Sequence, residues 1–452
     1  MARKFKTVDY EKTLDTTVTL REVLPPDHLA RFIVGIIALL DLSCLYAAYG
    51  LRGGEAYAPE ILLGLLFYGY ATGVFSSRGI EKATYESLPF RFIAGGLHPD
   101  HDTLADFRKR FLPQITELFV QVLLVAKELG ELKLGNISLD GGKFRADASK
   151  HHAVSYKRLL ELEEQLGKEV EELLALSERA DAEGLPEGVN VAEEIAFRQE
   201  RLVNLGQAKA VLEARAEERY QAEQVDYEAK LREREEKAQQ TGRKPGGRPP
   251  QPPTPGPRDK DQYNFTDPES HIMKNSTDQG FDQHYNAQAA VDQDSLLVVG
   301  CTVSAHANDQ GEALPTVDAI PAEAGTPEGA ALDNGYFSEG NVKGLEERQI
   351  EPYIATGREP HRGSWKAYFA QQPEEPGEDA SLREKMAYKL QTEIGRAIYR
   401  LRKRTVEPVL GIIKEVLGFR QFSLRGLVAV AGEWCLVCLA YNLKRLHRLQ
   451  TA

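Results

Sequence analysis

A long charged segment divides this chain into parts of different periodicity, and that division limits the possible folds more than any other feature. From Ser155 to Glu235 the sequence is rich in Glu, Leu, Ala and Arg, and its leucines recur every three to four residues. This spacing predicts amphipathic helices, which the Gly- and Pro-containing stretch Glu183–Asn190 folds into an antiparallel hairpin. Strand-like runs stand on both sides of the segment, so the hairpin is predicted to be an insertion in another fold.

Those strand-like runs predict a mixed α/β core. The first is Gly135–Asp140, and after the insertion Tyr285–Val291 and Leu296–Thr302 flank a four-residue hairpin turn. Gly329–Asp333 and Ile350–Ala355 are two further strands, with helices between and after them. Without the insertion, about five strands remain in the ribonuclease-H-like order. We therefore predict an α/β protein with a ribonuclease-H-like mixed sheet core, an all-helical N-terminal domain and a helical insertion after the first core strand.

The same changes of pattern predict where the domains begin and end. A helical N-terminal domain takes residues 1–128, and the sheet core takes residues 129–150 and 258–426. Between the two parts of the core lie the helical-hairpin insertion at 151–240 and a linker at 241–257, which is too rich in Pro and Gly for regular structure. A C-terminal helix takes residues 427–452.

The N-terminal domain is predicted to bind DNA. Its pattern is helical, and the helix over Asp100–Arg110 ends in the basic residues Arg108, Lys109 and Arg110. Several short helices that end in a basic one suit a helix-turn-helix-like DNA-binding module. The alternative is that these bases only complement the dipole at the end of their helix. The sequence leaves both interpretations open.

The net charge of −12 argues at first sight against a nucleic-acid partner, but the charge is unevenly distributed. The segment from Glu161 to Lys230 holds 19 acidic and 8 basic residues, so the insertion carries nearly the whole imbalance. From Ser381 to Arg448 there are 14 basic and 5 acidic residues. A basic C-terminal region is what a phosphate-binding surface needs.

Neither a membrane span nor a disulfide framework is predicted. The apolar stretches Phe32–Tyr49 and Ile61–Phe75 are interrupted or shorter than the ~20 residues of a span, and are interpreted as buried helices. Cys435 and Cys438 share one face of an apolar helix and are predicted to be buried free thiols. This composition is typical of an ordinary soluble protein.

Three acidic residues are candidates for a metal site. Asp140 ends the first predicted strand, Asp333 ends the fourth, and Glu407 lies in the last long helix of the core. Phosphoryl transfer on DNA uses two divalent cations, and Mg²⁺ prefers carboxylate oxygens as ligands. Gly141 and Gly335 follow the aspartates and allow the backbone to turn sharply there. Taken singly, each aspartate is equally well interpreted as a turn residue.

Longer motifs surround these acids, over a range from about Leu20 to Leu446. Before the insertion they are Phe75-Ser76-Ser77-Arg78-Gly79-Ile80-Glu81, Phe90-Arg91-Phe92-Ile93-Ala94-Gly95-Gly96-Leu97, Pro99-Asp100-His101-Asp102-Thr103, Phe107-Arg108-Lys109-Arg110 and Leu139-Asp140-Gly141-Gly142-Lys143. After it they are Asp267-Pro268-Glu269-Ser270, Tyr285-Asn286-Ala287-Gln288-Ala289-Ala290-Val291-Asp292, Leu332-Asp333-Asn334-Gly335-Tyr336 and Arg404-Thr405-Val406-Glu407-Pro408-Val409. In this order they resemble the transposases of bacterial insertion sequences, most closely insertion sequence family 1182 within the DDE superfamily.

The resemblance implies a catalytic site in which Asp140, Asp333 and Glu407 hold two Mg²⁺ ions, for which Mn²⁺ can substitute. The third motif of this superfamily has a tyrosine and an arginine before the glutamate and a lysine seven residues after it, and Lys414 matches the lysine. Tyr399 and Arg402 keep their mutual spacing, but Arg402 lies one residue too far from Glu407. Lys403 or Arg404 is therefore an alternative for the arginine. These basic residues and Tyr399 are the candidates for DNA contact near the cut.

The function implied is a transposase that binds the terminal inverted repeats of an insertion sequence and performs metal-dependent cleavage and strand transfer by cut-and-paste transposition. Its partners would be double-stranded DNA, at the element's ends and at the target, and a second copy in a homodimer. It would act in the bacterial cytoplasm at the nucleoid, away from membranes. Two alternatives are a catalytically silent, transposase-derived DNA-binding protein and a ribonuclease-H-like nuclease without strand transfer. A purely structural coiled coil would leave the strand patterns unexplained.

Overall fold

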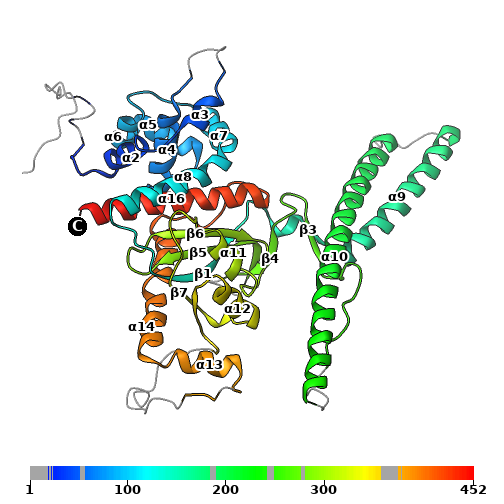
Figure 1. Ribbon diagram of the computed structural model, residues 1–452. Helices are drawn as coiled ribbons and strands as arrows, with labels where there is room; N and C mark the ends of the chain where they lie inside the picture. Colours follow the sequence, from blue (N-terminus) through cyan, green and yellow to red (C-terminus); the bar gives the residue numbers. More distant parts are fainter. Residues whose placement is uncertain are drawn as a thin grey trace, which may run out of the picture.

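The computed structural model describes residues 19, 22, 24–50, 56–183, 190–241, 249–275, 280–357, 375–377 and 379–451. It is a mixed α/β protein with a helical N-terminal region, a sheet core below it and a helical hairpin that projects to one side (Figure 1). These parts agree with the coarse fold predicted from the sequence. Residues 1–18 of the predicted N-terminal domain and residues 242–248 of the predicted linker lie outside the described residues.

The N-terminal region is helical throughout its described part. Its elements are α2 (Leu29–Ile37), α3 (Ser43–Ala47), α4 (Pro59–Thr72), α5 (Ser77–Glu86), α6 (Leu88–Ile93), α7 (His101–Arg110) and α8 (Leu112–Glu128). Pro59 occupies the first turn of α4, where the missing N–H costs nothing, and Ser76 caps α5 by accepting the N–H of Gly79. Helix α4 is buried almost all round, as the apolar run predicted.

The core is a six-stranded mixed sheet. Its strands are β1 (Asn136–Arg145), β4 (His271–Lys274), β5 (Phe281–Asp292), β6 (Val298–Ser304), β7 (Gly329–Leu332) and β8 (Glu351–Ile354). The hydrogen-bonded order is β4-β5-β1-β7-β8, and β6 also pairs with β5. Strand β1 runs antiparallel to β5 and parallel to β7, which is parallel to β8. Helices α11 (Ala313–Asp318) and α12 (Glu339–Glu347) pack against β6 and β8 respectively.

Strand β1 is longer than predicted. We expected it to end at Asp140, but it continues to Arg145 because its ladder with β5 runs unbroken from Ile137–Asp292 to Arg145–His284. The parallel ladder with β7 does end early, at Ser138. At Asp140, β1 is therefore still paired with β5 but no longer with β7. The predicted sharp turn at Gly141 is wrong, because Gly141 continues the strand.

Two long helices stand where the hairpin was predicted, and residues 184–189 of the predicted break lie outside the described residues. Helices α9 (Tyr156–Glu183) and α10 (Val191–Thr241) pack together and extend away from the core (Figure 1). A small apolar cluster of its own, including Leu159 and Leu212, fixes the pair near its base. The base is joined to the core by a two-stranded ladder of β2 (Ala153–Ser155) and β3 (Gln262–Asn264), after a short turn η1 (Lys150–His152).

The C-terminal region is helical in short steps and then in one long helix. The steps are α13 (Leu382–Lys389), α14 (Glu393–Leu401), η4 (Arg402–Arg404), α15 (Val406–Gly411) and a π-helical turn η5 (Ile412–Val416). The long helix α16 (Leu427–Thr451) crosses between the N-terminal helices and the sheet (Figure 1).

Helix α16 is a core helix rather than an appendage. It is long and apolar enough to cross a membrane by composition, but 72% of its apolar window is buried inside the protein. The indole of Trp434 donates to the carbonyl of Gln288 on β5, and the side chain of Asn442 pairs with both backbone groups of Val298 on β6. Cys435 and Cys438 are buried free thiols, as predicted.

Candidate active site

Asp140 and Asp333 stand at matching positions on neighbouring parallel strands. In the register of β1 and β7, Ser138 lies opposite Ala331, and each aspartate comes two residues later. Asp333 directly follows β7 and begins the turn η2 (Asn334–Tyr336), where its Oδ1 accepts the N–H of Gly335 at 2.7 Å. The two carboxylates therefore lie at the same edge of the sheet.

Glu407 reaches this edge because a helix break fixes α15 against β1. The Thr405 hydroxyl lies 2.8 Å from the Ser138 hydroxyl on β1 and donates to the carbonyl of Leu401. The backbone of Thr405 leaves the helical region, with φ −117° and ψ −83°, and α15 begins at the next residue. Pro408 then falls in the first turn of α15, where a proline breaks no helical hydrogen bond. Pro408 therefore lies at the start of the helix and does not interrupt it.

Arg402 bridges two of the three acids. Its Nη1 donates to Asp140 Oδ2 at 3.1 Å and its Nη2 lies 2.9 Å from Glu407 Oε1, while its own side chain is only 9% exposed. The tyrosine ring of Tyr399 packs 5.9 Å from the guanidinium carbon. Arg402 thus contacts Glu407 despite its extra residue of spacing, since the chain between them passes through the turn η4 and the break at Thr405. The alternatives Lys403 and Arg404 are exposed.

The acids repel one another in a partly buried setting. Burial is the largest cause that raises the pKa of Asp140, to about 6, and the charges of Asp333 and Glu407 raise it further. The Arg402 guanidinium and the N–H of Gly141 lower the same pKa without cancelling the rise. One guanidinium is therefore too little positive charge for this group of carboxylates, and added positive charge here would be stabilising.

Lys414 also lies near Asp140. Its ammonium group sits 4.5 Å from the centre of the Phe144 ring, a cation–π contact. Burial lowers the pKa of Lys414, and the nearby charge of Asp140 partly opposes that effect. A Cβ atom at Gly142 would stand 2.9 Å from Lys414 Nζ, and one at Gly141 would stand 2.3 Å from the Gln288 amide. Both glycines therefore serve close approach to β1, in place of the turn that we expected.

We expect Lys414→Ala to lower the rate of DNA cleavage more than it lowers DNA affinity. Loss of one phosphate contact should reduce the salt slope of binding by about one, whereas misplacing a group near the reacting bond costs up to roughly a hundredfold in rate. Single-turnover cleavage and anisotropy titrations at several salt concentrations measure both effects. Lys343→Ala, an exposed lysine on α12, is the control. Equal, small effects of the two variants would remove Lys414 from the site.

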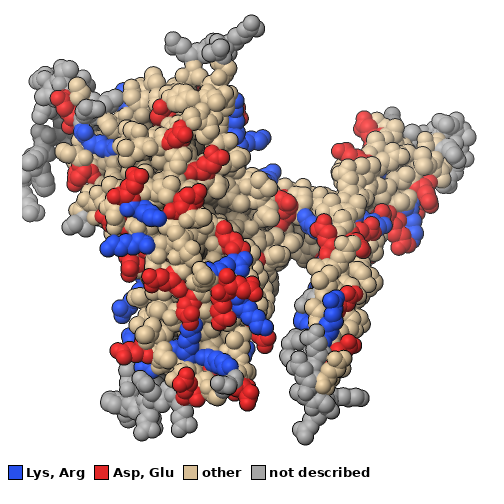
Figure 2. Space-filling view, viewed as in Figure 1, with Lys and Arg blue, Asp and Glu red and all other residues tan. Residues whose placement is uncertain are grey.

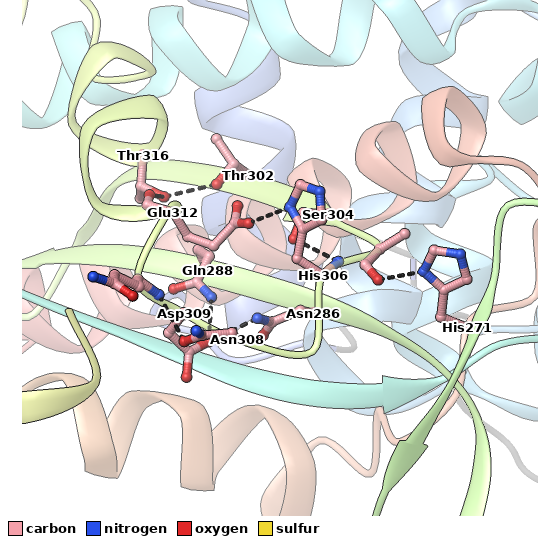
Figure 3. Close-up of polar contacts among 12 residues, drawn as sticks. His271, Asn286, Gln288, Thr302, Ser304, His306, Asn308, Asp309, Glu312 and Thr316 are labelled. Carbon is pink, nitrogen blue, oxygen red and sulfur yellow. Dashed lines mark hydrogen bonds and ion pairs between the residues drawn. The ribbon is translucent and has the colours of Figure 1, made fainter. Parts of the chain in front are cut away.

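A fourth carboxylate, Asp309, lies beside these acids and was not predicted. Its Oδ1 accepts from the side-chain amides of Asn286 at 2.7 Å and Gln288 at 3.0 Å, both on β5 (Figure 3). A Cβ atom at Gly335 would lie 2.9 Å from Asp333 Oδ1 and 3.9 Å from Asp309 Oδ2, so both carboxylates border Gly335. The loop that carries Asp309 has no recognisable motif, so only the fold brings it here.

We expect Asp309→Asn to weaken Mg²⁺ binding about tenfold, because groups just outside a metal's ligands commonly contribute that much to its affinity. Asparagine keeps an oxygen that can accept from Asn286 and Gln288, so the loop should hold its shape. A Mn²⁺ titration followed by electron paramagnetic resonance measures the change without DNA. Gln310→Ala, an exposed neighbour, serves as the comparison; a wild-type Mn²⁺ affinity for Asp309→Asn would rule out this role.

The basic residues that end α7 do not behave alike. Arg108 is buried, and its Nη1 donates to the Tyr70 hydroxyl at 2.8 Å. That hydroxyl lies 3.1 Å from the buried Glu433 of α16, so Arg108 belongs to an internal network that links the N-terminal region to α16. Lys109 and Arg110 are exposed, and Arg110 packs its guanidinium 5.1 Å from the Phe111 ring. Of the three basic residues predicted to contact DNA, Lys109 and Arg110 face solvent and Arg108 does not.

The donor set suits a hard divalent cation. In the part of the chain that the structure describes, no three His, Cys, Asp or Glu side chains form a preformed metal site. Arg402 instead lies between Asp140 and Glu407. The fit rests on chemistry: the acids offer only oxygen ligands, and burial, together with the charges of Asp333 and Glu407, raises the pKa of Asp140. A cation at this edge would relieve that repulsion.

Comparison with known proteins places this arrangement in a family. A transposase domain matches residues 18–110, which take in the described helices α2 to α7. A transposase DDE domain matches residues 253–443, which carry Asp333, Glu407, Arg402 and Lys414. The comparisons with curated proteins and with solved structures found no match. The chain thus carries two transposase domains, one of them a DDE domain, and both support a DDE transposase of the insertion-sequence type.

The second match begins only after the hairpin. Strand β1, with Asp140, precedes the hairpin and is absent from the matched range. The structure nevertheless pairs β1 with β5 and β7, both of which the match includes. The hairpin therefore lies between β1 and the later strands in the sequence, although β1 pairs with those strands in the sheet.

Proposed function

We propose that this transposase binds the terminal inverted repeats of its insertion sequence and catalyses metal-dependent DNA cleavage and strand transfer. The observation that supports this most is the common position of three acids. Asp140 and Asp333 follow paired positions of two parallel strands, and Glu407 is tied to Asp140 through Arg402. Turn residues with only a local role would have no reason to meet from positions this far apart in the sequence.

We further propose that the core is ribonuclease-H-like and that the chain belongs to insertion sequence family 1182. The strand order β6-β5-β1-β7-β8 supports the first point. On one side of β1 lies the antiparallel strand β5, to which β6 is antiparallel in turn, and on the other side β7 and β8 run parallel to β1. The motifs around Asp140, Asp333 and Glu407 support the second.

In this proposal the three acids would hold two Mg²⁺ ions, or Mn²⁺ in their place. Bound there, the cations supply activation of the attacking hydroxyl and stabilisation of the leaving oxygen. Arg402 would hold Asp140 and Glu407 in position, with the Tyr399 ring packed against its guanidinium group. Lys414, and Arg404 from the exposed side of η4, would contact phosphates near the cut, because an ammonium or guanidinium cannot ligate a cation.

We expect the protein to act as a homodimer on two DNA ends, in the cytoplasm and at the nucleoid. Lys109 and Arg110 of α7 would contribute DNA contacts, whereas Arg108 is taken up inside the protein. Three consecutive basic residues would therefore have different roles: Arg108 supports the fold, and Lys109 and Arg110 would contact DNA.

The test is a cleavage assay on DNA that carries the ends of the element in which the gene lies. With Mg²⁺ we expect nicks at the ends and joining to a target plasmid, and with EDTA we expect neither. Binding without cleavage in any divalent cation would favour the catalytically silent alternative. Cleavage without joining, even with pre-nicked ends, would favour a nuclease without strand transfer.

A further inference from the structure

A polar cleft of about 550 Å³ lies between the base of the hairpin and the sheet core. Helix α10 contributes Arg215 and Arg219, four residues apart on one face, and the segment before β3 contributes Lys260. The rest of the polar lining is Asp261, Gln262, His271 on β4, and the loop residues His306 and Asn308. The catalytic proposal uses none of these residues.

Two buried guanidinium nitrogens in this cleft have no hydrogen-bond partner. Arg215 donates through Nη2 to the carbonyl of Pro268 at 2.9 Å, but its buried Nη1 is unpartnered. Arg219 pairs with Asp261 at 2.8 Å and with the carbonyl of Gly256, but its buried Nε is unpartnered. Leaving a charged donor buried and unpaired is costly, so such groups commonly mark a missing partner.

The cleft has an excess of positive charge. Asp261, the acid in its lining, is already engaged by Arg219 and by the backbone N–H of Arg258. Across the described residues, neither Arg215 nor Lys260 forms an ion pair with a carboxylate. On the face of the protein shown in Figure 2, by contrast, basic and acidic side chains are interspersed. The missing partner is therefore an anion, and guanidinium groups suit phosphate in particular.

The cleft adjoins the candidate active site through one rigid loop. Asn308 lines the cleft, and the next residue, Asp309, faces Asp333 across Gly335. The loop is fixed by polar contacts: His271 donates to the carbonyl of Ala305, and His306 lies 2.8 Å from Glu312 (Figure 3). The cleft and the acids therefore lie on the two sides of one short loop, so one DNA molecule can contact both.

We propose that this cleft binds a backbone phosphate of the DNA substrate, so that the acidic hairpin contacts DNA through the basic face at its base. This inference rests on the proposed DNA-cleaving function and adds a second anchor to it. Most of the hairpin still repels DNA by its charge, whereas Arg215, Arg219 and Lys260 form a local exception. The hairpin then helps to align the strand that passes over Asp140 and Asp333.

The test compares DNA binding by the full chain and three charge-removing variants in EDTA, so that no cleavage occurs. Arg215→Gln and Lys260→Gln should each lower affinity for a labelled duplex roughly three- to tenfold and reduce the salt slope by about one. Arg232→Gln is the matched control, since Arg232 lies on the same helix but is 73% exposed and pairs with Glu228. Lys260 is exposed, so its variant tests the cleft even if Arg215→Gln loosens α10.

A second titration, with inorganic phosphate, distinguishes DNA from a free anion. If both variants lose phosphate affinity but bind DNA as the wild type does, the cleft is a free-anion site and the proposal is overturned. If wild-type protein binds and cleaves DNA while both variants match Arg232→Gln, the proposal fails and the proposed function stands. If the wild type does not bind DNA at all, both fail.

Discussion

Asp333→Asn is expected to abolish DNA cleavage while leaving the fold and DNA binding intact. Asparagine keeps the oxygen that accepts the N–H of Gly335, so the turn η2 should survive. The substitution removes one of the negative charges that would hold the cations. Metal ions contribute several kcal/mol to such reactions, so the rate should fall at least about a thousandfold.

Single-turnover cleavage of element-end DNA measures this loss, and anisotropy with the same DNA measures binding. Asp294→Asn is the matched control, because Asp294 is an exposed acid in the β5–β6 turn, away from the paired strand ends. Cleavage by Asp333→Asn at the wild-type rate would show that Asp333 is only a turn residue.

Arg402→Ala is expected to have the second largest effect, and on stability as well as on cleavage. The guanidinium is nearly buried and is shared by Asp140 and Glu407, so its removal leaves carboxylates facing one another. Breaking a buried ion pair from one side costs about 3 kcal/mol or more. The free energy of unfolding in EDTA should fall by about that amount. The fall is reduced at Glu407, because solvent screens the charge of this half-exposed carboxylate.

The same variant should recover part of its stability in Mg²⁺, because a bound cation would offset the repulsion that Arg402 offsets now. Urea unfolding with Mg²⁺ and with EDTA measures this difference. Arg404→Ala, on the same turn but exposed, should change neither stability nor its dependence on Mg²⁺. A loss in Arg402→Ala that is equal under both conditions would mean that Arg402 supports packing alone.

Much of the architecture was predictable because it depends on local periodicity. The hairpin, the β5–β6 turn and the buried helix α4 each follow from a repeat that the sequence displays. The length of β1 was not predictable, because Gly141 and Gly142 suggest a turn when they are considered alone. They stay in the strand because β5 pairs with them, and that partner lies beyond the whole insertion.

The sequence identifies the three acidic residues of the candidate site but not the residues that surround them. Asp140, Asp333 and Glu407 stand in motifs, whereas Asp309 stands in a loop that only the fold brings to Gly335. The position of Arg402 depends on the tight turn before Thr405, which spacing alone does not reveal. Arg108 is directed inward by Tyr70 and Glu433, which lie in two other helices.

The placement of α16 has a consequence for how the chain is made. This last helix packs against α4, α8 and β6, and its buried side chains belong to the same apolar core as those of the N-terminal helices. During synthesis the N-terminal helices are therefore made long before the helix that covers them. A chain truncated before Leu427 would leave apolar faces of α4, α8 and β6 uncovered, so neither the N-terminal helices nor the sheet can complete its core before α16 has been made.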